Sequence, residues 1–284
     1  MDHGMKIART PEITRQVQEA GALRSEIIQQ IKAEFPEVLL EKNDNWNATH
    51  LLKTIELSAE SFDLVLERQL PSEIGRTASM LSGPFFTSTE FPAPTSESAL
   101  LYPIVQIDLR AISALMALPL GDGLLQLWYR GDEFEGEVIV VPRSAVVAEA
   151  VTVFPVELPD GPLASLPLHW SSDPLGDGVL QIVGLRSTGL QCQDGHVEMY
   201  CSALHDKMSP ELLHLLTRFR ETATFVDSIH MFGTFYPIHY SSDDVCMRCL
   251  FNIPDWGPSG CNAQVFYNVE PDGSVDFSFM DTVR

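Results

Sequence analysis

Two stretches of the chain, about residues 79–141 and 228–281, carry the same succession of short sequence patterns. In the first stretch, the patterns are a Ser-Gly-Pro-Phe-Phe segment at 82–86 and alternating apolar and polar residues at 105–108 and 125–129. The second stretch repeats this order at 232–236, 251–254 and 263–267. Alternation with a period of two is typical of antiparallel strands that bury one face. We therefore predict a duplicated antiparallel sheet module, in which two similar half-sheets pack together.

Each copy continues with an acidic, glycine-containing turn and then a closing strand. The turns lie at 131–136 and 270–273. In the second copy, Val275, Phe277 and Phe279 alternate with Asp276 and Ser278, which predicts a strand that is apolar on one face. The order of patterns is the same in both copies, and this order favours duplication over chance.

The first 75 residues have a helical pattern instead. Thr10-Pro11-Glu12 predicts a helix start, because a hydroxyl at the N-cap, a proline at the first helical position and an acidic residue all favour the amino end. Apolar residues then recur at helical spacing until Pro36. A helix is therefore predicted between these two prolines.

Two further helices are predicted. One follows Asn47 and ends at Pro71, and another begins at Ser209-Pro210-Glu211. The apolar stripe of the former consists of Leu51, Ile55, Phe62, Leu66 and Leu70. The fold class is therefore predicted to be α+β, with N-terminal helices over residues 1–75 and a sheet-rich domain over residues 76–284. Residues 142–227 are predicted to form an insertion between the two repeat modules.

Four segments form an ordered pattern: Ser82-Gly83-Pro84, Pro92-Ala93-Pro94, the strand that ends in Gln106-Ile107-Asp108-Leu109, and Gly123-Leu124-Leu125-Gln126. In this order they resemble the YwqG-like family of uncharacterised bacterial proteins. The resemblance covers roughly residues 75–284 and implies a duplicated α+β sheet protein. The family has no established activity, so the resemblance implies no catalytic residues. Members in toxin–immunity gene neighbourhoods imply a binding role.

The chain departs from the family pattern at its glycines. Ser82-Gly83 and Gly233-Thr234 stand where the family usually has paired glycines, and the family's Gly-Asp pair is absent near Gly260-Cys261. Any ligand loop that depends on those glycines is therefore not expected here.

The charge of the chain is strongly negative. It has 18 Lys and Arg against 39 Asp and Glu, a net charge of −21. Without a cationic surplus, binding to nucleic-acid phosphates or to anionic membranes is disfavoured. Residues 85–209 hold 16 Asp and Glu against 5 Lys and Arg, a net charge of −11. This concentration of charge favours a basic protein partner.

An acidic run after the strand at 125–129 is the predicted partner-binding site. The predicted contact residues are Asp132, Glu133, Phe134, Glu135 and Glu137. Trp128 is expected to lie beside them as an exposed aromatic residue. The run lacks the spacing of an EF-hand calcium loop. A solvated hairpin tip is the alternative interpretation.

We expect a non-enzymatic, cytoplasmic protein-binding module, of the kind represented by immunity-type inhibitors of toxins. A nuclease toxin is the favoured partner class, since an active site built for phosphates is basic. Cytoplasmic placement is expected because the N-terminus lacks a signal-peptide pattern and the five cysteines are odd in number. The alternatives are an enzyme or small-ligand binder with a cleft between the two sheet modules, a zinc-stabilised structural protein, and an acidic stress protein without a fixed partner. No catalytic residues and no cofactor are predicted.

Two local sequence patterns bear on the zinc-binding and enzyme alternatives. Cys246 and Cys249, with Cys261 and either His239 or His230, could supply a Cys3His set for structural zinc. Against zinc, no tight turn is evident between Cys246 and Cys249, and free cysteines are often buried as small apolar residues.

The second pattern is the segment at 184–189, in which Ser187 lies among glycines. This segment lacks the G-x-S-x-G nucleophile motif. A hairpin turn explains its glycines equally well.

Overall fold

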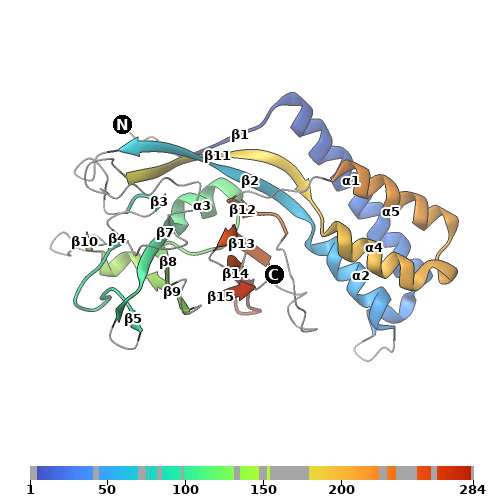
Figure 1. Cartoon of the computed structure of the whole chain (residues 1–284). Coiled ribbons are helices and arrows are strands. Elements are labelled where there is room, and N and C mark those ends of the chain that lie inside the picture. Colours follow the sequence, from blue (N-terminus) through green and yellow to red (C-terminus); the bar gives the residue numbers. More distant parts are fainter. Residues whose placement is uncertain are drawn as a thin grey trace. The chain divides into compact units, whose positions relative to one another are not determined.

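The computed structural model describes residues 5–40, 45–69, 75, 77–81, 85–96, 99–130, 135–146, 152–153, 179–223, 229–234, 248–256 and 261–282, and Figure 1 shows their helices and strands. Helices and a large antiparallel sheet are both present, which confirms the α+β class. The chain divides into two compact units. Unit 1 comprises Met1–Ile7, Leu64–Leu185 and Ile253–Arg284, and unit 2 comprises Ala8–Asp63 and Arg186–Asn252.

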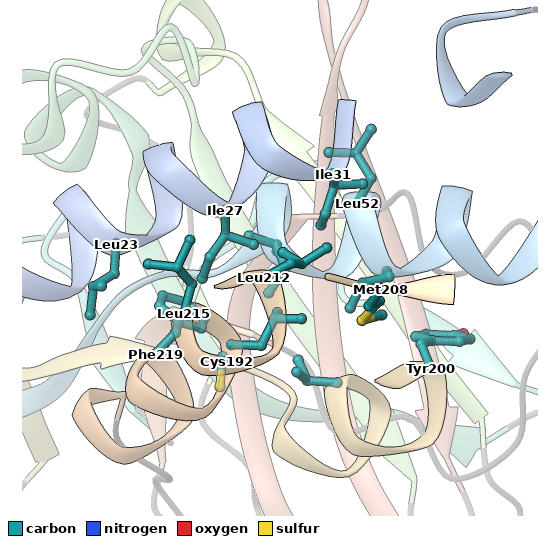
Figure 2. Packing of buried hydrophobic residues seen from close by; sticks show 14 of the residues in the cluster. Leu23, Ile27, Ile31, Leu52, Cys192, Tyr200, Met208, Leu212, Leu215 and Phe219 are labelled. Carbon is teal, nitrogen blue, oxygen red and sulfur yellow. The ribbon is translucent and has the colours of Figure 1, made fainter. Parts of the chain in front are cut away.

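The helices of unit 2 build an apolar core of their own. They are α1 (Pro11–Glu34), the 3-10 helix η1 (Pro36–Leu39), α2 (Trp46–Leu57), α4 (Asp194–Leu204), η4 (His205–Lys207) and α5 (Pro210–Thr222). Helix α1 packs on α5, and α2 packs on α4. Their apolar stripes meet in one cluster that includes Ile27, Ile31, Leu212 and Phe219, all fully or almost fully buried (Figure 2).

Local capping explains where these helices begin. The hydroxyl of Thr10 accepts a hydrogen bond from the Ile13 amide at 3.2 Å, as the sequence predicts. Ser209 does the same for the Leu212 amide at 3.0 Å and also donates to the Glu34 carboxylate. Burial acts to raise the pKa of Glu34, but the hydrogen bonds from Ser209 and Gln30 together outweigh it and lower that pKa. Glu34 therefore ties the end of α1 to the start of α5.

The predicted helix from Asn47 to Pro71 is wrong in its second half. Helix α2 ends at Leu57, Ser58 adopts an extended conformation, and strand β2 (Ala59–Gln69) follows. Phe62 and Leu66 are four residues apart. Residues at this spacing lie on the same face of a helix, and they also lie on the same face of a strand. The apolar stripe therefore could not distinguish the two structures.

Strand β2 and three other strands, β1 (Lys6–Ala8), β11 (Val179–Gln191) and β13 (Arg248–Trp256), each contribute residues to both units. In unit 2, β12 (His230–Phe232) pairs antiparallel with β2 and with β13. This places Met231 between Phe62 and Phe251, and all three are fully buried. The predicted insertion at 142–227 contains β11, α4 and α5.

Unit 1 contains most of the strands. They are β1 (Lys6–Ala8), β3 (Met80–Leu81), β4 (Phe85–Phe86), β5 (Thr95–Ser96), β6 (Ala99–Leu100), β7 (Tyr102–Asp108), β8 (Leu124–Arg130), β9 (Glu135–Val141), β10 (Thr152–Val153), β14 (Cys261–Val269) and β15 (Val275–Thr282). Helix α3 (Leu109–Met116) follows β7, and the 3-10 helix η2 (Arg143–Ala145) follows β9. Neighbouring strands in the large sheet follow the order β15-β14-β13-β12-β2-β11-β3-β7-β8-β9, with β1 beside β11.

The two strands that end this order, β9 and β15, lie close to each other in unit 1. A Cβ atom placed on Gly136 of β9 would lie 2.3 Å from the ring of Phe279 on β15. The ring therefore packs directly on the backbone of β9. The alternation of Val275, Phe277 and Phe279 correctly predicted a closing strand here.

Candidate protein-binding surface

Of the acidic run at 132–137, the structure describes only the last three residues, 135–137. Glu137 is exposed on β9 and lies opposite Trp128 of β8. Glu135 begins β9, where its backbone pairs with Arg130. Asp132, Glu133 and Phe134 lie outside the described residues. The structure thus places one predicted contact residue, Glu137, at the surface.

Trp128 is not the exposed aromatic residue that the sequence predicts. Its side chain is 1% exposed, its Nε1 donates to Gln126 Oε1 at 3.0 Å, and its ring packs edge-on against Phe85. The prediction failed because both faces of β8 are buried, so alternation along this strand does not mark a solvent-exposed face.

Trp128 belongs to a buried network of amide side chains. Gln106 Oε1 accepts from the Phe86 amide and from Gln126 Nε2, both at 2.9 Å. Gln106 Nε2 donates to the Ala78 carbonyl at 2.9 Å, and Gln126 Nε2 also donates to the Phe86 carbonyl at 2.7 Å. The network satisfies both backbone groups of Phe86, which holds β4 over strands β7 and β8.

Asp108, another residue that carries the family resemblance, has a comparable structural role. Its Oδ1 accepts from the amides of Arg110 and Ala111 at 3.1 and 3.4 Å and so caps helix α3. Its Oδ2 lies 3.1 Å from Nη2 of Arg143. The motif residues Gln106, Asp108 and Gln126 therefore hold the fold of unit 1 together.

The acidic charge is distributed unevenly between the two units. Unit 1 contains 21 Asp and Glu against 7 Lys and Arg, a net charge of −14, whereas unit 2 contains 18 against 11, a net charge of −7. Ion pairs that involve Lys or Arg are more numerous in the less acidic unit 2. Among the described residues, the pairs of unit 2 that involve Lys or Arg are Arg9–Glu60, Lys32–Glu56, Arg186–Asp63, Arg218–Glu19 and Arg220–Glu198, and unit 1 has Arg143–Asp108.

Exposed carboxylates without a lysine or arginine partner lie on the described segments of both units. Unit 1 has six of them: Glu67, Glu90, Asp122, Glu137, Asp272 and Asp276. Unit 2 has five: Glu12, Glu26, Asp206, Glu211 and Glu221. No ion pair joins any of the six to a described lysine or arginine. Carboxylates of this kind keep their negative field available to an incoming cationic surface.

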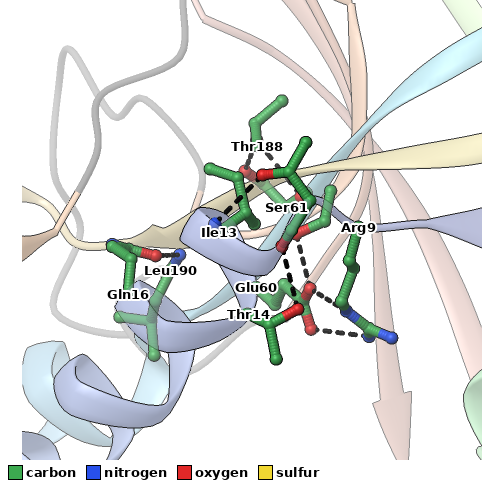
Figure 3. Close-up of polar contacts among 10 residues, drawn as sticks. Arg9, Ile13, Thr14, Gln16, Glu60, Ser61, Thr188 and Leu190 are labelled. Atoms are coloured by element: carbon green, nitrogen blue, oxygen red, sulfur yellow. Dashed lines mark hydrogen bonds and ion pairs between the residues drawn. The ribbon is translucent and has the colours of Figure 1, made fainter.

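Ser187 lies inside β11 and not in the hairpin turn that the sequence offers as an explanation of its glycines. Its hydroxyl donates to Glu60 Oε1 at 2.5 Å, and Arg9 holds the same carboxylate with two hydrogen bonds of 2.6 and 2.9 Å. Figure 3 shows the Arg9–Glu60 pair beside the hydrogen-bonded hydroxyls of Ser61 and Thr188. The cluster therefore fastens strands β2 and β11 to Arg9, which precedes α1.

The proposed zinc ligands are described in part. Cys246 and His239 lie outside the described residues, and Cys261 begins β14. His230 and Cys249 are buried on β12 and β13, and burial raises the pKa of the Cys249 thiol to about 12. Within the described ranges, no group of three or more His, Cys, Asp or Glu side chains is placed to hold a metal ion. The environment of Cys249 favours the alternative of a buried free thiol.

We expect Cys249 to resist alkylation in the folded protein. With a pKa of about 12, roughly one thiol in ten thousand is ionised at about pH 8, and the thiolate is the reactive form. Treatment with iodoacetamide followed by peptide mass spectrometry should show modification of Cys249 at least about 100-fold slower than that of the half-buried Cys201. In denaturant the two rates should converge, and equal rates in the native protein would contradict the buried-thiol interpretation.

Unit 2 carries four exposed large apolar side chains that the sequence did not predict. They are Leu39 and Leu40 at 64% and 61% exposure, Trp46 at 50% and Met199 at 45%. Trp46 stacks on His50 with ring centroids 4.0 Å apart and meets the edge of Tyr200 at 5.7 Å. The adjacent leucines after Pro36 were the available signal, but Met199 comes from a distant segment.

Comparison with known proteins returns no relative for this chain: no protein-family model, no curated protein and no solved structure matches it. Among the helices that the structure describes, none combines the length and apolar character needed to cross a bilayer.

Proposed function

We propose that this chain is a non-enzymatic, cytoplasmic protein-binding module that captures a basic protein, as an immunity-type inhibitor captures a toxin. The observation that supports the proposal is the charge distribution of unit 1. Its net charge is −14, and its six exposed carboxylates have no ion pair with a described lysine or arginine. Unit 2 has half of that net charge, −7, and five described Lys or Arg ion pairs against one in unit 1.

The mechanism of capture is electrostatic steering. A field of one sign accelerates the encounter with an oppositely charged surface, and like charges reject partners that are acidic. Glu137 and the acidic run that precedes it supply this field at the β8–β9 connection. Occlusion of the partner's active site follows from contact. A nuclease toxin fits this mechanism because carboxylates can occupy the positions of the phosphates that its active site binds.

The acidic run should carry a large part of the affinity. We expect Glu135→Lys/Glu137→Lys to weaken binding of the partner by about 10-fold or more at low salt, because two attractions become repulsions. The partner is first isolated with the wild-type protein as bait and identified by mass spectrometry. Binding of the purified partner is then measured by titration calorimetry at several salt concentrations. Wild-type affinity should fall as salt rises.

The matched control changes the same charge on unit 2. Glu26→Lys/Glu221→Lys replaces two exposed glutamates of α1 and α5 that have no described ion pair. This control should weaken binding by about 3-fold or less, through the change in net charge alone. Equal losses in the two double variants, or wild-type affinity that does not depend on salt, would contradict an acidic binding site at 132–137.

We also propose that the sheet arose by duplication and that the chain is a divergent member of the YwqG-like family. The strand orders β3-β7-β8-β9 and β12-β13-β14-β15 support the duplication, because the repeats at 79–141 and 228–281 match strand by strand. The repeat also pairs Gln106 with Asn252 and Gln126 with Gln264, and all four amide side chains are buried. Buried amides at equivalent strand positions are uncommon enough to support common descent.

A further inference from the structure

A glycine inside the acidic run lies in direct contact with an aromatic ring. Gly136 stands between Glu135 and Glu137 on β9. Three ring atoms of Phe279 on β15 lie 2.3, 2.6 and 2.6 Å from the position that a Cβ atom of Gly136 would take. Real Cβ atoms essentially never come this close to another atom, so only glycine leaves room for the ring. The Phe279 ring therefore rests on the backbone of the acidic run itself.

The start of β9 is supported from two sides within unit 1. On one side, its first three residues pair in register with residues 128–130 of β8. On the other side, β15 lies close to β9, and Gly136 meets the Phe279 ring. The acidic run thus enters β9 at a point where backbone pairing and an aromatic contact act together.

The strand that carries Phe279 is itself well paired. Strand β15 pairs antiparallel with β14 over eight residue pairs, and Phe279 lies opposite Val265, which is fully buried. Phe279 is half-buried. The backbone that carries the ring is therefore held by pairing that does not involve β9.

We propose that Phe279 is a positioning residue for the acidic binding site, because its ring holds the backbone at Gly136 and so fixes where Glu137 presents its carboxylate. Glu137 is exposed and follows directly on the contact. A charged group that is held in place before the encounter loses less conformational entropy on binding than a mobile one. The inference rests on the proposed function of unit 1. It gives β15, the closing strand of the second repeat module, a part in a site that the first module carries.

Hydrogen exchange of the full chain tests the contact without any partner. The amides of residues 135–138 are followed by NMR in the wild type, in Gly136→Ala, in Phe279→Ala and in the double variant. Each single variant should exchange these amides at least about 10-fold faster, because the new methyl group displaces the ring or the ring is absent. In the double variant both changes remove the same contact. Its loss should therefore stay near that of the larger single variant, well short of the about 100-fold expected from two independent effects.

Phe277→Ala is the matched control. Phe277 is also half-buried, lies two residues earlier on the same face of β15, and pairs opposite Tyr267. This variant should leave the exchange of amides 135–138 within about 2-fold of the wild type. Additive losses in the double variant, or equal losses in Phe277→Ala and Phe279→Ala, would overturn the proposal. If Phe279→Ala fails to fold, Phe279→Leu takes its place in the cycle, with an expected loss of about 3-fold.

Binding is then measured with the purified basic partner that the wild-type bait isolates. Phe279→Ala should weaken this binding by about 5-fold, through the cost of ordering the acidic run. The salt dependence of binding should stay that of the wild type, because no charge has changed. If Glu135→Lys/Glu137→Lys weakens binding and Phe279→Ala does not, the positioning role is wrong while the proposed function stands. If neither variant weakens binding, the acidic site is wrong and the positioning role fails with it.

Discussion

Replacing Gln106 with methionine should lower the free energy of unfolding by about 3–5 kcal/mol, a large change for a substitution that preserves volume. Methionine cannot accept from the Phe86 amide or donate to the Ala78 carbonyl, so one buried and one half-buried backbone group lose their partners. Gln126 also loses its contact with Gln106 Oε1. Each unsatisfied buried group costs about 1–3 kcal/mol. Urea denaturation followed by circular dichroism measures the change.

Gln181→Met is the control for this variant. Gln181 lies half-buried on β11 of unit 1, and we expect its replacement to change stability by less than about 1 kcal/mol. A loss in Gln106→Met no larger than in the control would mean that the amide network contributes little, and that β4 is held by the apolar contacts of Phe85 and Phe86.

Gly233→Ala should destabilise the protein by about 2–4 kcal/mol, because strain in the backbone adds to a collision. Gly233 has a φ angle of +79°, and a Cβ atom there would lie 2.0 Å from Gln191 Oε1 and 2.7 Å from Ser61 Cβ. Gln191 cannot swing away without cost, since its Oε1 accepts from the Thr234 amide at 3.0 Å. Thermal unfolding should show a clear decrease in the melting temperature.

Gly273 provides the matched control. Its φ angle of +85° is similar, but a Cβ atom there would meet nothing within 4 Å. Gly273→Ala should therefore show the cost of the backbone conformation alone, about 1–2 kcal/mol. The difference between the two alanine variants measures the collision with Gln191 and Ser61. Equal losses would show that Gln191 moves aside freely.

Local signals predicted the parts of the fold that depend on few neighbours. The N-caps at Thr10 and Ser209 form within a single helical turn, and the sequence predicts both correctly. The strands at 105–108, 125–129 and 275–279 also appear where their alternation places them. By contrast, β2 exists because β12 and β11 flank it, and residues 59–69 contain no local pattern that excludes a helix.

The candidate site shows the same division. The exposure of Glu137 agrees with its acidic neighbourhood in the sequence. The burial of Trp128 depends on Phe85, which reaches β8 because Gln106 and Gln126 hold the neighbouring backbone of Phe86. The sequence of residues 125–129 therefore does not by itself predict that Phe85 covers Trp128. The contact between helices α2 and α4 likewise joins segments about 150 residues apart in the sequence, which no local pattern predicts.

The contact between Phe279 and Gly136 has a consequence for solubility. A strand that ends a sheet offers unpaired backbone groups to other molecules, and proteins with such edges risk strand-to-strand aggregation. Here β9 and β15 lie close together, and the Phe279 ring covers the backbone of β9 at Gly136. Any side chain at position 136 would keep the ring away from that backbone. A glycine at position 136 thus lets one end strand shield the other, and it reduces the opportunity for a foreign strand to add to the sheet.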